Sequence, residues 1–120
     1  DTVVEIRGEI LGKPESPEAA VRMLEKLSGS IHRIIGGWCV LRGERIYHGV
    51  EQCLVEFRTL QSDEIDAYVE SGEPSDKAGS YAIQGGAGGF VRRFSGFWSN
   101  AIGLPLIPVT SAVENLFVSD

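Results

Sequence analysis

The sequence has few of the features that mark a membrane-embedded or disulfide-stabilised protein. No apolar run approaches the roughly 18 residues that a membrane-spanning helix needs. Only two of the 120 residues are cysteine, Cys39 and Cys53. Both stand inside apolar, strand-like segments, which indicates buried reduced thiols rather than a disulfide framework. We therefore expect a cytoplasmic protein with no membrane partner.

Basic residues are also scarce. The chain has 11 lysines and arginines against 17 aspartates and glutamates, a formal net charge of −6 at pH 7. This balance opposes nonspecific attraction to nucleic acid, so we expect no nucleic-acid partner. An anionic ligand would need a local group of cations. The length and the 42% hydrophobic content fit one globular domain over residues 1–120.

The widespread motifs of catalysis and nucleotide binding do not occur. The glycine run at 85–89 contains neither a Walker lysine nor the GxGxxG that opens a helix after a strand. No serine stands in a nucleophile elbow. The two histidines, His32 and His48, lie in strand-like segments without partners at metal-ligand spacing, which favours a structural role for each.

Apolar alternation and turn residues predict several strands. Residues 1–11 fit a short hairpin that turns at Arg7-Gly8. Two long antiparallel strands are expected at 31–41 and 45–58, because both segments are rich in β-branched and aromatic residues and a tight turn separates them. Further strand-like runs are 81–83, after which Gln84 would stand at a strand end, and 89–94.

Helical periodicity and capping residues predict the remaining elements. One helix is expected within 16–29 with Ser16 as its N-cap, and a second within 62–72 with Ser62 as its N-cap. The last segment, 104–117, should form a helix whose inner face is Val109, Ala112, Val113 and Leu116. Interleaved strands and helices predict an α/β domain with a mixed, twisted sheet and flanking helices.

The stretch SDKAGSYAIQGGAGG, residues 75–89, is the strongest functional signal in the composition. Five of its fifteen positions are glycine, which suits a backbone that takes positive φ or approaches another group closely. Asp76 and Lys77 could be only an exposed ion pair, whereas the Gln84 amide can both donate and accept, as base recognition requires. Lys13, in the GKP turn, is free to meet a ligand, although most turn lysines are simply solvated.

Five short motifs are spread along nearly the whole chain. They are DTVV with GKP (1–14), LSG-x-x-H (27–32), FRTL (57–60), GEPSDKAGSYAIQG (72–85) and SNAIGLPL (99–106). They occur in the order in which the Maf family of nucleoside triphosphate pyrophosphatases has them. The sequence thus resembles the C-terminal two-thirds of a septum-formation-inhibitor-like protein. The resemblance implies a Maf/ITPase-like fold that lacks the family's N-terminal strand and helix.

The resemblance also implies a reaction and its residues. Members of the family hydrolyse nucleotides such as dTTP and UTP to the monophosphate and pyrophosphate, with Mg²⁺ or Mn²⁺. Asp1 would accept a proton from the attacking water and help to hold the metal, and Lys13 would lie against the triphosphate. Thr2 and Gln84 match positions tied to substrate choice, and Lys77 is a further substrate-binding candidate. A homodimer is expected, because family members are commonly dimeric.

Alternatives to an active pyrophosphatase stay open. The family's first strand leads into an S-x-x-R-R turn that binds phosphate through two guanidiniums and helix amides, and the sequence does not contain this motif. The chain could therefore be a noncatalytic nucleotide-binding or dimerisation module, or an incomplete stretch of a longer enzyme. Pyrophosphate release that depends on Asp1 would distinguish turnover from binding alone.

Overall fold

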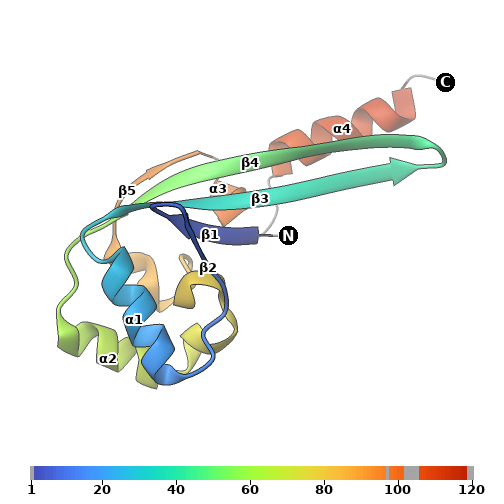
Figure 1. Cartoon of the computed structure of the whole chain (residues 1–120). Coiled ribbons are helices and arrows are strands. Elements are labelled where there is room, and N and C mark those ends of the chain that lie inside the picture. Colours follow the sequence, from blue (N-terminus) through green and yellow to red (C-terminus); the bar gives the residue numbers. More distant parts are fainter. Residues whose placement is uncertain (1, 97, 102–105, 119–120) are drawn as a thin grey trace.

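A single sheet organises the fold. The computed structural model describes residues 2–96, 98–101 and 106–118, and in these residues five strands form one sheet in the order β2-β1-β3-β4-β5 (Figure 1). Every neighbouring pair is antiparallel. The strands are β1 Thr2–Ile6, β2 Glu9–Leu11, β3 Ile31–Arg42, β4 Arg45–Phe57 and β5 Val91–Ser95. None of the described helices is both long and apolar enough to cross a membrane.

The α/β class is as predicted, but the prediction of a mixed sheet is wrong. The chain leaves β2, forms α1 (Pro17–Leu27) and returns as β3. Strands β2 and β3 run in the same direction, yet β3 pairs with β1 and not with β2. A helix between two strands usually signals a parallel pair. Here β1 lies between β2 and β3, so these two strands do not pair although they run in the same direction.

Both predicted hairpins form, and their turns explain why. Arg7 and Gly8 have φ of 49° and 83°, the pair of positive values that a tight two-residue turn between twisted strands requires. Strands β3 and β4 pair from Ile31 opposite Glu56 to Arg42 opposite Arg45. The far half of this long hairpin extends well past the other strands (Figure 1), and the molecule measures 58 × 27 × 25 Å.

Two helices cover one face of the sheet at its broad end. Helix α1 begins as predicted, because the Ser16 hydroxyl accepts a hydrogen bond from the Ala19 N–H at 3.1 Å. Helix α2 spans Ser62–Glu70, and its N-cap is Gln61 rather than the predicted Ser62. The Glu64 carboxylate accepts from the Gln61 N–H at 3.1 Å, which fixes the helix start one residue earlier.

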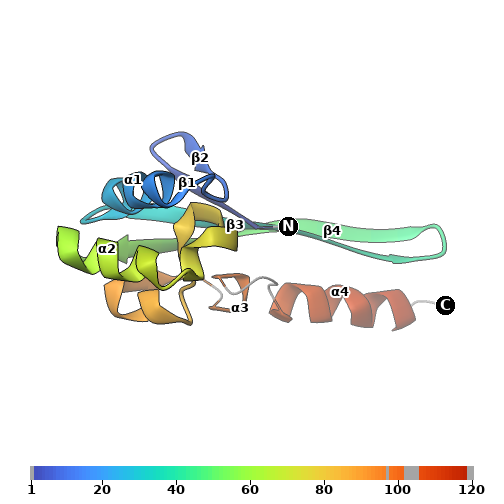
Figure 2. The same ribbon diagram turned by 90° about the horizontal axis from the view of Figure 1, so that it is seen from below.

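The C-terminal helices lie beside the long hairpin (Figure 2). They are α3, Trp98–Ala101, and α4, Leu106–Val118. Ala112 and Leu116 are buried as predicted, whereas Val113 is 39% exposed, contrary to its predicted place on the inner face. The Leu116 carbonyl accepts hydrogen bonds from the guanidiniums of Arg42 and Arg45 at 2.9 and 3.0 Å. These bonds hold the last turn of α4 against the tip of the hairpin.

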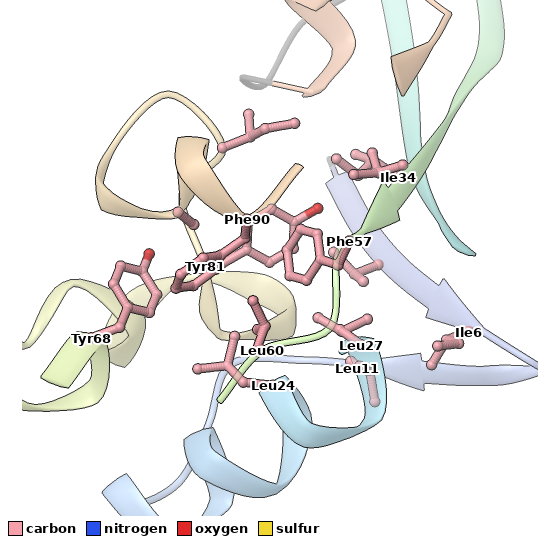
Figure 3. Packing of buried hydrophobic residues seen from close by; sticks show 14 of the residues in the cluster. Ile6, Leu11, Leu24, Leu27, Ile34, Phe57, Leu60, Tyr68, Tyr81 and Phe90 are labelled. Atoms are coloured by element: carbon pink, nitrogen blue, oxygen red, sulfur yellow. The ribbon is translucent and has the colours of Figure 1, made fainter. Parts of the chain in front are cut away.

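The core fills the space between the sheet and α1 and α2 (Figure 3). Phe57, 1% exposed, lies at its centre and meets the rings of His32, Tyr81 and Phe90 edge to face, at centroid distances of 5.0, 4.9 and 5.8 Å. Cys53 is buried as predicted, but Cys39 is exposed, because it stands opposite His48 on the other face of the hairpin.

The glycine-rich segment between α2 and β5 is built from short turns. Its 3-10 turns are η1 Glu73–Asp76, η2 Ala78–Ser80 and η3 Gly86–Phe90. The run 81–83 is not the predicted strand. Tyr81 and Ile83 are both buried, at 6% and 4% exposure, so the alternation typical of a strand is real, but the N–H of the intervening Ala82 donates to a tyrosine hydroxyl instead of a neighbouring strand.

Candidate functional site

A pocket of about 260 Å³ opens between β1, β3 and the glycine-rich segment. Four residues predicted from the sequence line it: Thr2, Lys13, Lys77 and Gln84. Residue 1 falls outside the described residues, so the predicted role of Asp1 has no geometry here. The other lining residues are Val4, Ile34, Asp76, Ala78, Tyr81, Ala82, Ile83 and Ala101.

One backbone contact brings the lysines to the same pocket although 64 positions separate them in the chain. The Gly79 N–H donates to the Gly12 carbonyl at 3.1 Å, so the turn that holds Lys13 lies against the turn that follows Lys77. Gly79 has φ of 70°, and a Cβ there would lie 3.0 Å from the Val4 methyl groups. Glycine is thus required at position 79 both by its backbone conformation and by its contact with β1.

The pocket combines a polar mouth with an apolar floor. Lys13 is exposed, and the Lys77 ammonium lies 3.7 Å from the Asp76 carboxylate with both side chains largely in solvent. Such an exposed pair contributes little stability and leaves the ammonium available to another anion. Val4, Ile34 and Ile83 form the apolar side, against which a flat ring can pack.

Gln84 lines this pocket, is exposed, and stands in a turn rather than at a strand end. The Gly85 N–H donates to the Ala82 carbonyl at 3.0 Å and closes the turn. The glycines that follow allow the close approach of another group, and this group is a side chain of the same chain. A Cβ on Gly85 would collide with the carboxylate of Glu73, and the Gly86 N–H donates to that carboxylate at 3.0 Å.

A buried histidine supports the pocket floor from below. His32 is 1% exposed, and its Nε2 lies 2.5 Å from the Tyr81 hydroxyl. Burial lowers the pKa of His32 to about 4, so the ring is neutral at pH 7. Burial raises the pKa of the Tyr81 phenol far above its ordinary value. This placement in the core agrees with the structural role expected for His32.

The described residues contain no cluster of side chains that could by itself coordinate a metal ion. No group of three or more histidine, cysteine, aspartate or glutamate side chains gathers anywhere in 2–96, 98–101 and 106–118. Asp76 is the described carboxylate at the pocket, and its side chain is 73% exposed. Mg²⁺ commonly uses only one or two protein carboxylates together with substrate phosphates and water.

Sequence reasoning did not single out Tyr68, Glu73 or Tyr81. Tyr81 lines the pocket, and Tyr68 and Glu73 accept hydrogen bonds from the backbone on either side of Gln84. In the sequence, Tyr68 and Tyr81 have the pattern of ordinary buried aromatic residues. Glu73 stands in the GEP start of the motif, and the signal that could have found it is the glycine pair at 85–86, because adjacent glycines often mark a close approach of another group. The group that approaches comes from the same chain.

Comparison with known proteins supports one family. A dTTP/UTP pyrophosphatase of Pyrococcus abyssi is 45% identical over 114 residues, which cover 95% of this chain and 61% of the relative. A protein of the same name from Geobacter sulfurreducens is 46% identical over 118 residues, covering 97% and 62%. A third, from Shewanella denitrificans, is 40% identical over 120 residues, covering 100% and 61%.

The chain therefore spans about three fifths of the length of these curated relatives. The family model described as Maf-like protein matches residues 1–116. A match over almost the whole chain, with identities of 40 to 46% to these relatives, identifies the family that the ordered motifs indicated. The chain belongs to the Maf-like protein family.

Proposed function

We propose that this chain carries the nucleotide site of a pyrophosphatase that converts dTTP- or UTP-type nucleotides to the monophosphate and pyrophosphate. The observation that carries the proposal is the meeting of Thr2, Lys13, Lys77 and Gln84 in one pocket. Two lysines gather there in a chain whose net charge is −6. The names of the relatives, dTTP/UTP pyrophosphatase, support the substrate class.

The lining residues suit the different parts of a pyrimidine nucleotide. Lys13 and Lys77 would lie against the phosphates and offset the charge that develops as pyrophosphate leaves. The Gln84 amide can accept a hydrogen bond from a uracil or thymine N–H and donate one to a ring carbonyl. The apolar lining residues Val4, Ile34 and Ile83 would pack against the base.

Asp1 and a divalent cation complete the proposed chemistry. Asp1 precedes Thr2, which lines the pocket, and we assign Asp1 the role of proton acceptor for the attacking water. Mg²⁺ or Mn²⁺, when bound with the substrate, would offset the negative charge of the phosphates. Asp1 and Asp76 are the carboxylates that would hold it, because oxygen ligands suit these cations.

The proposed partner, besides the nucleotide, is a second copy of the chain, and the proposed location is the cytoplasm. The sheet face opposite α4 carries several exposed apolar side chains on the long hairpin. They are Leu41, Ile46, Val50 and Leu54, at 64, 58, 70 and 44% exposure. An apolar surface of this kind is typical of an interface between subunits.

A second candidate function is nucleotide binding without turnover. Its motivating observation is the cation set of the pocket, which consists of two lysines and no arginine among the described lining residues. A lysine provides a point charge, whereas an arginine guanidinium binds a phosphate through two parallel hydrogen bonds. Such a pocket could hold a nucleotide without organising it for hydrolysis.

Pyrophosphate release tests the proposal. Release from dTTP, UTP and GTP is measured with Mg²⁺ or Mn²⁺ for the wild-type chain and for Asp1→Asn and Gln84→Ala. We expect a preference for dTTP and UTP, a loss of about 100-fold or more in Asp1→Asn, and a loss of about tenfold in base preference in Gln84→Ala. Asp66→Asn and Gln52→Ala, both exposed and outside the pocket, are matched controls.

Each alternative result has a distinct meaning. Nucleotide binding with no Asp1-dependent release would favour the binding module over the enzyme. Absence of both binding and release would overturn both functions. Equal losses in Gln84→Ala and Gln52→Ala would contradict the assignment of Gln84 as the residue that reads the base.

A further inference from the structure

The backbone around Gln84 is held by two side chains that do not themselves line the pocket. On one side, the Ala82 N–H donates to the Tyr68 hydroxyl at 3.0 Å. On the other, the Gly86 N–H donates to the Glu73 carboxylate, at 3.0 Å to Oε2 and 3.3 Å to Oε1. Gln84 therefore lies midway between two anchored amides, each two residues away.

The two anchors lie close to each other, and one of them belongs to the core. Tyr68 is 7% exposed, and its ring meets that of Phe90 edge to face at 5.3 Å (Figure 3). Burial raises the pKa of the Tyr68 phenol, and the nearby Glu73 carboxylate raises it further. The phenol accepts a hydrogen bond from the Ala82 N–H, while the Glu73 carboxylate and the edge of the Tyr68 ring both lie against Gly86.

The shape of the turn is specific to this arrangement. A Cβ on Gly85 would meet the Glu73 Oε1, and one on Gly86 would lie 3.0 Å from Oε2 and 3.1 Å from the Tyr68 ring. Both glycines are therefore fitted to the carboxylate that lies against them.

We propose that Tyr68 and Glu73 are positioning residues for base selection, which hold the backbone on both sides of Gln84 so that its amide meets the base in one orientation. This inference rests on the proposed nucleotide site. An amide group has a donor end and an acceptor end, so its orientation decides which base edge it can satisfy. A loosened turn would let the amide adapt to other bases, and discrimination would fall.

The test compares substrates within each variant, so that the fraction of folded enzyme cancels. Values of kcat/KM for UTP and GTP are measured in wild type, Tyr68→Phe, Glu73→Ala and Glu73→Gln. We expect the UTP-to-GTP ratio to fall about tenfold in Tyr68→Phe and Glu73→Ala, chiefly through KM for UTP. Glu73→Gln, which keeps one acceptor oxygen, should recover part of the ratio. Tyr47→Phe and Glu70→Gln are exposed, matched controls.

Amide hydrogen exchange provides a readout that needs no turnover. We expect faster exchange at Ala82 in Tyr68→Phe and at Gly86 in Glu73→Ala, with the controls unchanged. If kcat/KM for UTP and GTP falls in the same proportion, the two residues only maintain the fold and the inference is wrong. Failure of the wild-type chain to bind or hydrolyse any nucleotide would instead overturn the proposed function, and this inference with it.

Discussion

His32 is enclosed by the rings of Phe57 and Tyr81, whose centroids lie 5.0 and 5.4 Å from its own. Its Nδ1 is buried without a hydrogen-bond partner among the residues that the structure describes. A protonated ring would therefore carry an N–H donor with no acceptor in this environment. The neutral form is favoured in the folded state, as the lowered pKa of about 4 indicates.

This histidine predicts an acid-sensitive fold. Because the pKa of His32 is about 4 when folded and 6.5 as the ordinary value, the unfolded chain binds more protons between these two pH values. The free energy of unfolding should therefore fall as the pH is lowered from 6.5 to 4, by about 3 kcal/mol from this residue. Urea unfolding of the wild-type chain across this pH range measures the loss.

The variant His32→Phe isolates the contribution. It should be less stable at pH 7, because the Tyr81 hydroxyl loses its partner, yet its stability should depend less on pH between 6.5 and 4. His48→Phe replaces an exposed histidine on the hairpin and should keep the wild-type slope. A wild-type slope in His32→Phe would show that other groups cause the acid sensitivity.

Individual site residues differed in how far the sequence could predict them. Thr2, Lys13, Lys77 and Gln84 could be proposed because they stand in ordered motifs, and the structure places all four at one pocket. Tyr68 and Glu73 act on the backbone of a distant turn. Their partners are N–H groups, which every residue except proline carries, so no pairing of side-chain types pointed to them.

At the level of elements, α3 is fixed to the sheet through one buried amide. Asn100 is fully buried, and its Nδ2 donates to the carbonyls of Ile34 and Glu51 at 3.3 and 3.1 Å. These carbonyls belong to β3 and β4. The close approach is possible because residue 36 is glycine, where an added Cβ would collide with the Asn100 Oδ1.

Gly36→Ala should therefore weaken the docking of α3. The new methyl group would displace Asn100 and leave buried carbonyls short of a donor, at a cost of about 1–3 kcal/mol in the free energy of unfolding. Gly37→Ala is the control, since a Cβ there meets nothing within 4 Å. Denaturant titration of both variants checks the difference. Equal stabilities would mean that Asn100 can shift without loss.

Elements governed by neighbouring residues were the ones the sequence predicted well. Ser16 and Pro17 start α1, and Arg7-Gly8 turns the first hairpin, as expected. The antiparallel order of the sheet depends on β1 lying between β2 and β3, which no local pattern reveals. The run 81–83 has the alternation of a strand because Tyr81 and Ile83 are both buried in the core. Alternating burial alone cannot distinguish a strand from the irregular segment that forms here.

The whole molecule has two unlike faces along its long hairpin. Arg42 and Arg45, which pair in register, both reach the Leu116 carbonyl, so α4 covers their side of the hairpin. Side chains alternate along a strand, and the opposite side therefore carries Leu41 opposite Ile46, and Val50 opposite Gly37. The described helices leave this apolar side exposed.

The proposed homodimer would use this exposed side, which predicts the effect of a single charge. Val50→Glu should shift the chain from dimer to monomer in sedimentation velocity, because burial of an unpaired carboxylate in an apolar interface is unfavourable. Val113→Glu, which changes a partly exposed valine of α4, should leave the dimer intact. A wild-type chain that sediments as a monomer at high concentration would contradict the proposed dimer.

The pocket between β1 and the glycine-rich segment is the proposed binding site for a pyrimidine nucleotide. The most direct test is a titration of ¹⁵N-labelled protein with UTP and Mg²⁺, followed by the amide shifts of the described residues. We predict that the largest saturable shifts occur at Thr2, Lys13, Lys77 and Gln84, and that GTP shifts Gln84 less than UTP does. Saturable shifts confined to another surface, or none at all, would contradict this assignment of the binding site.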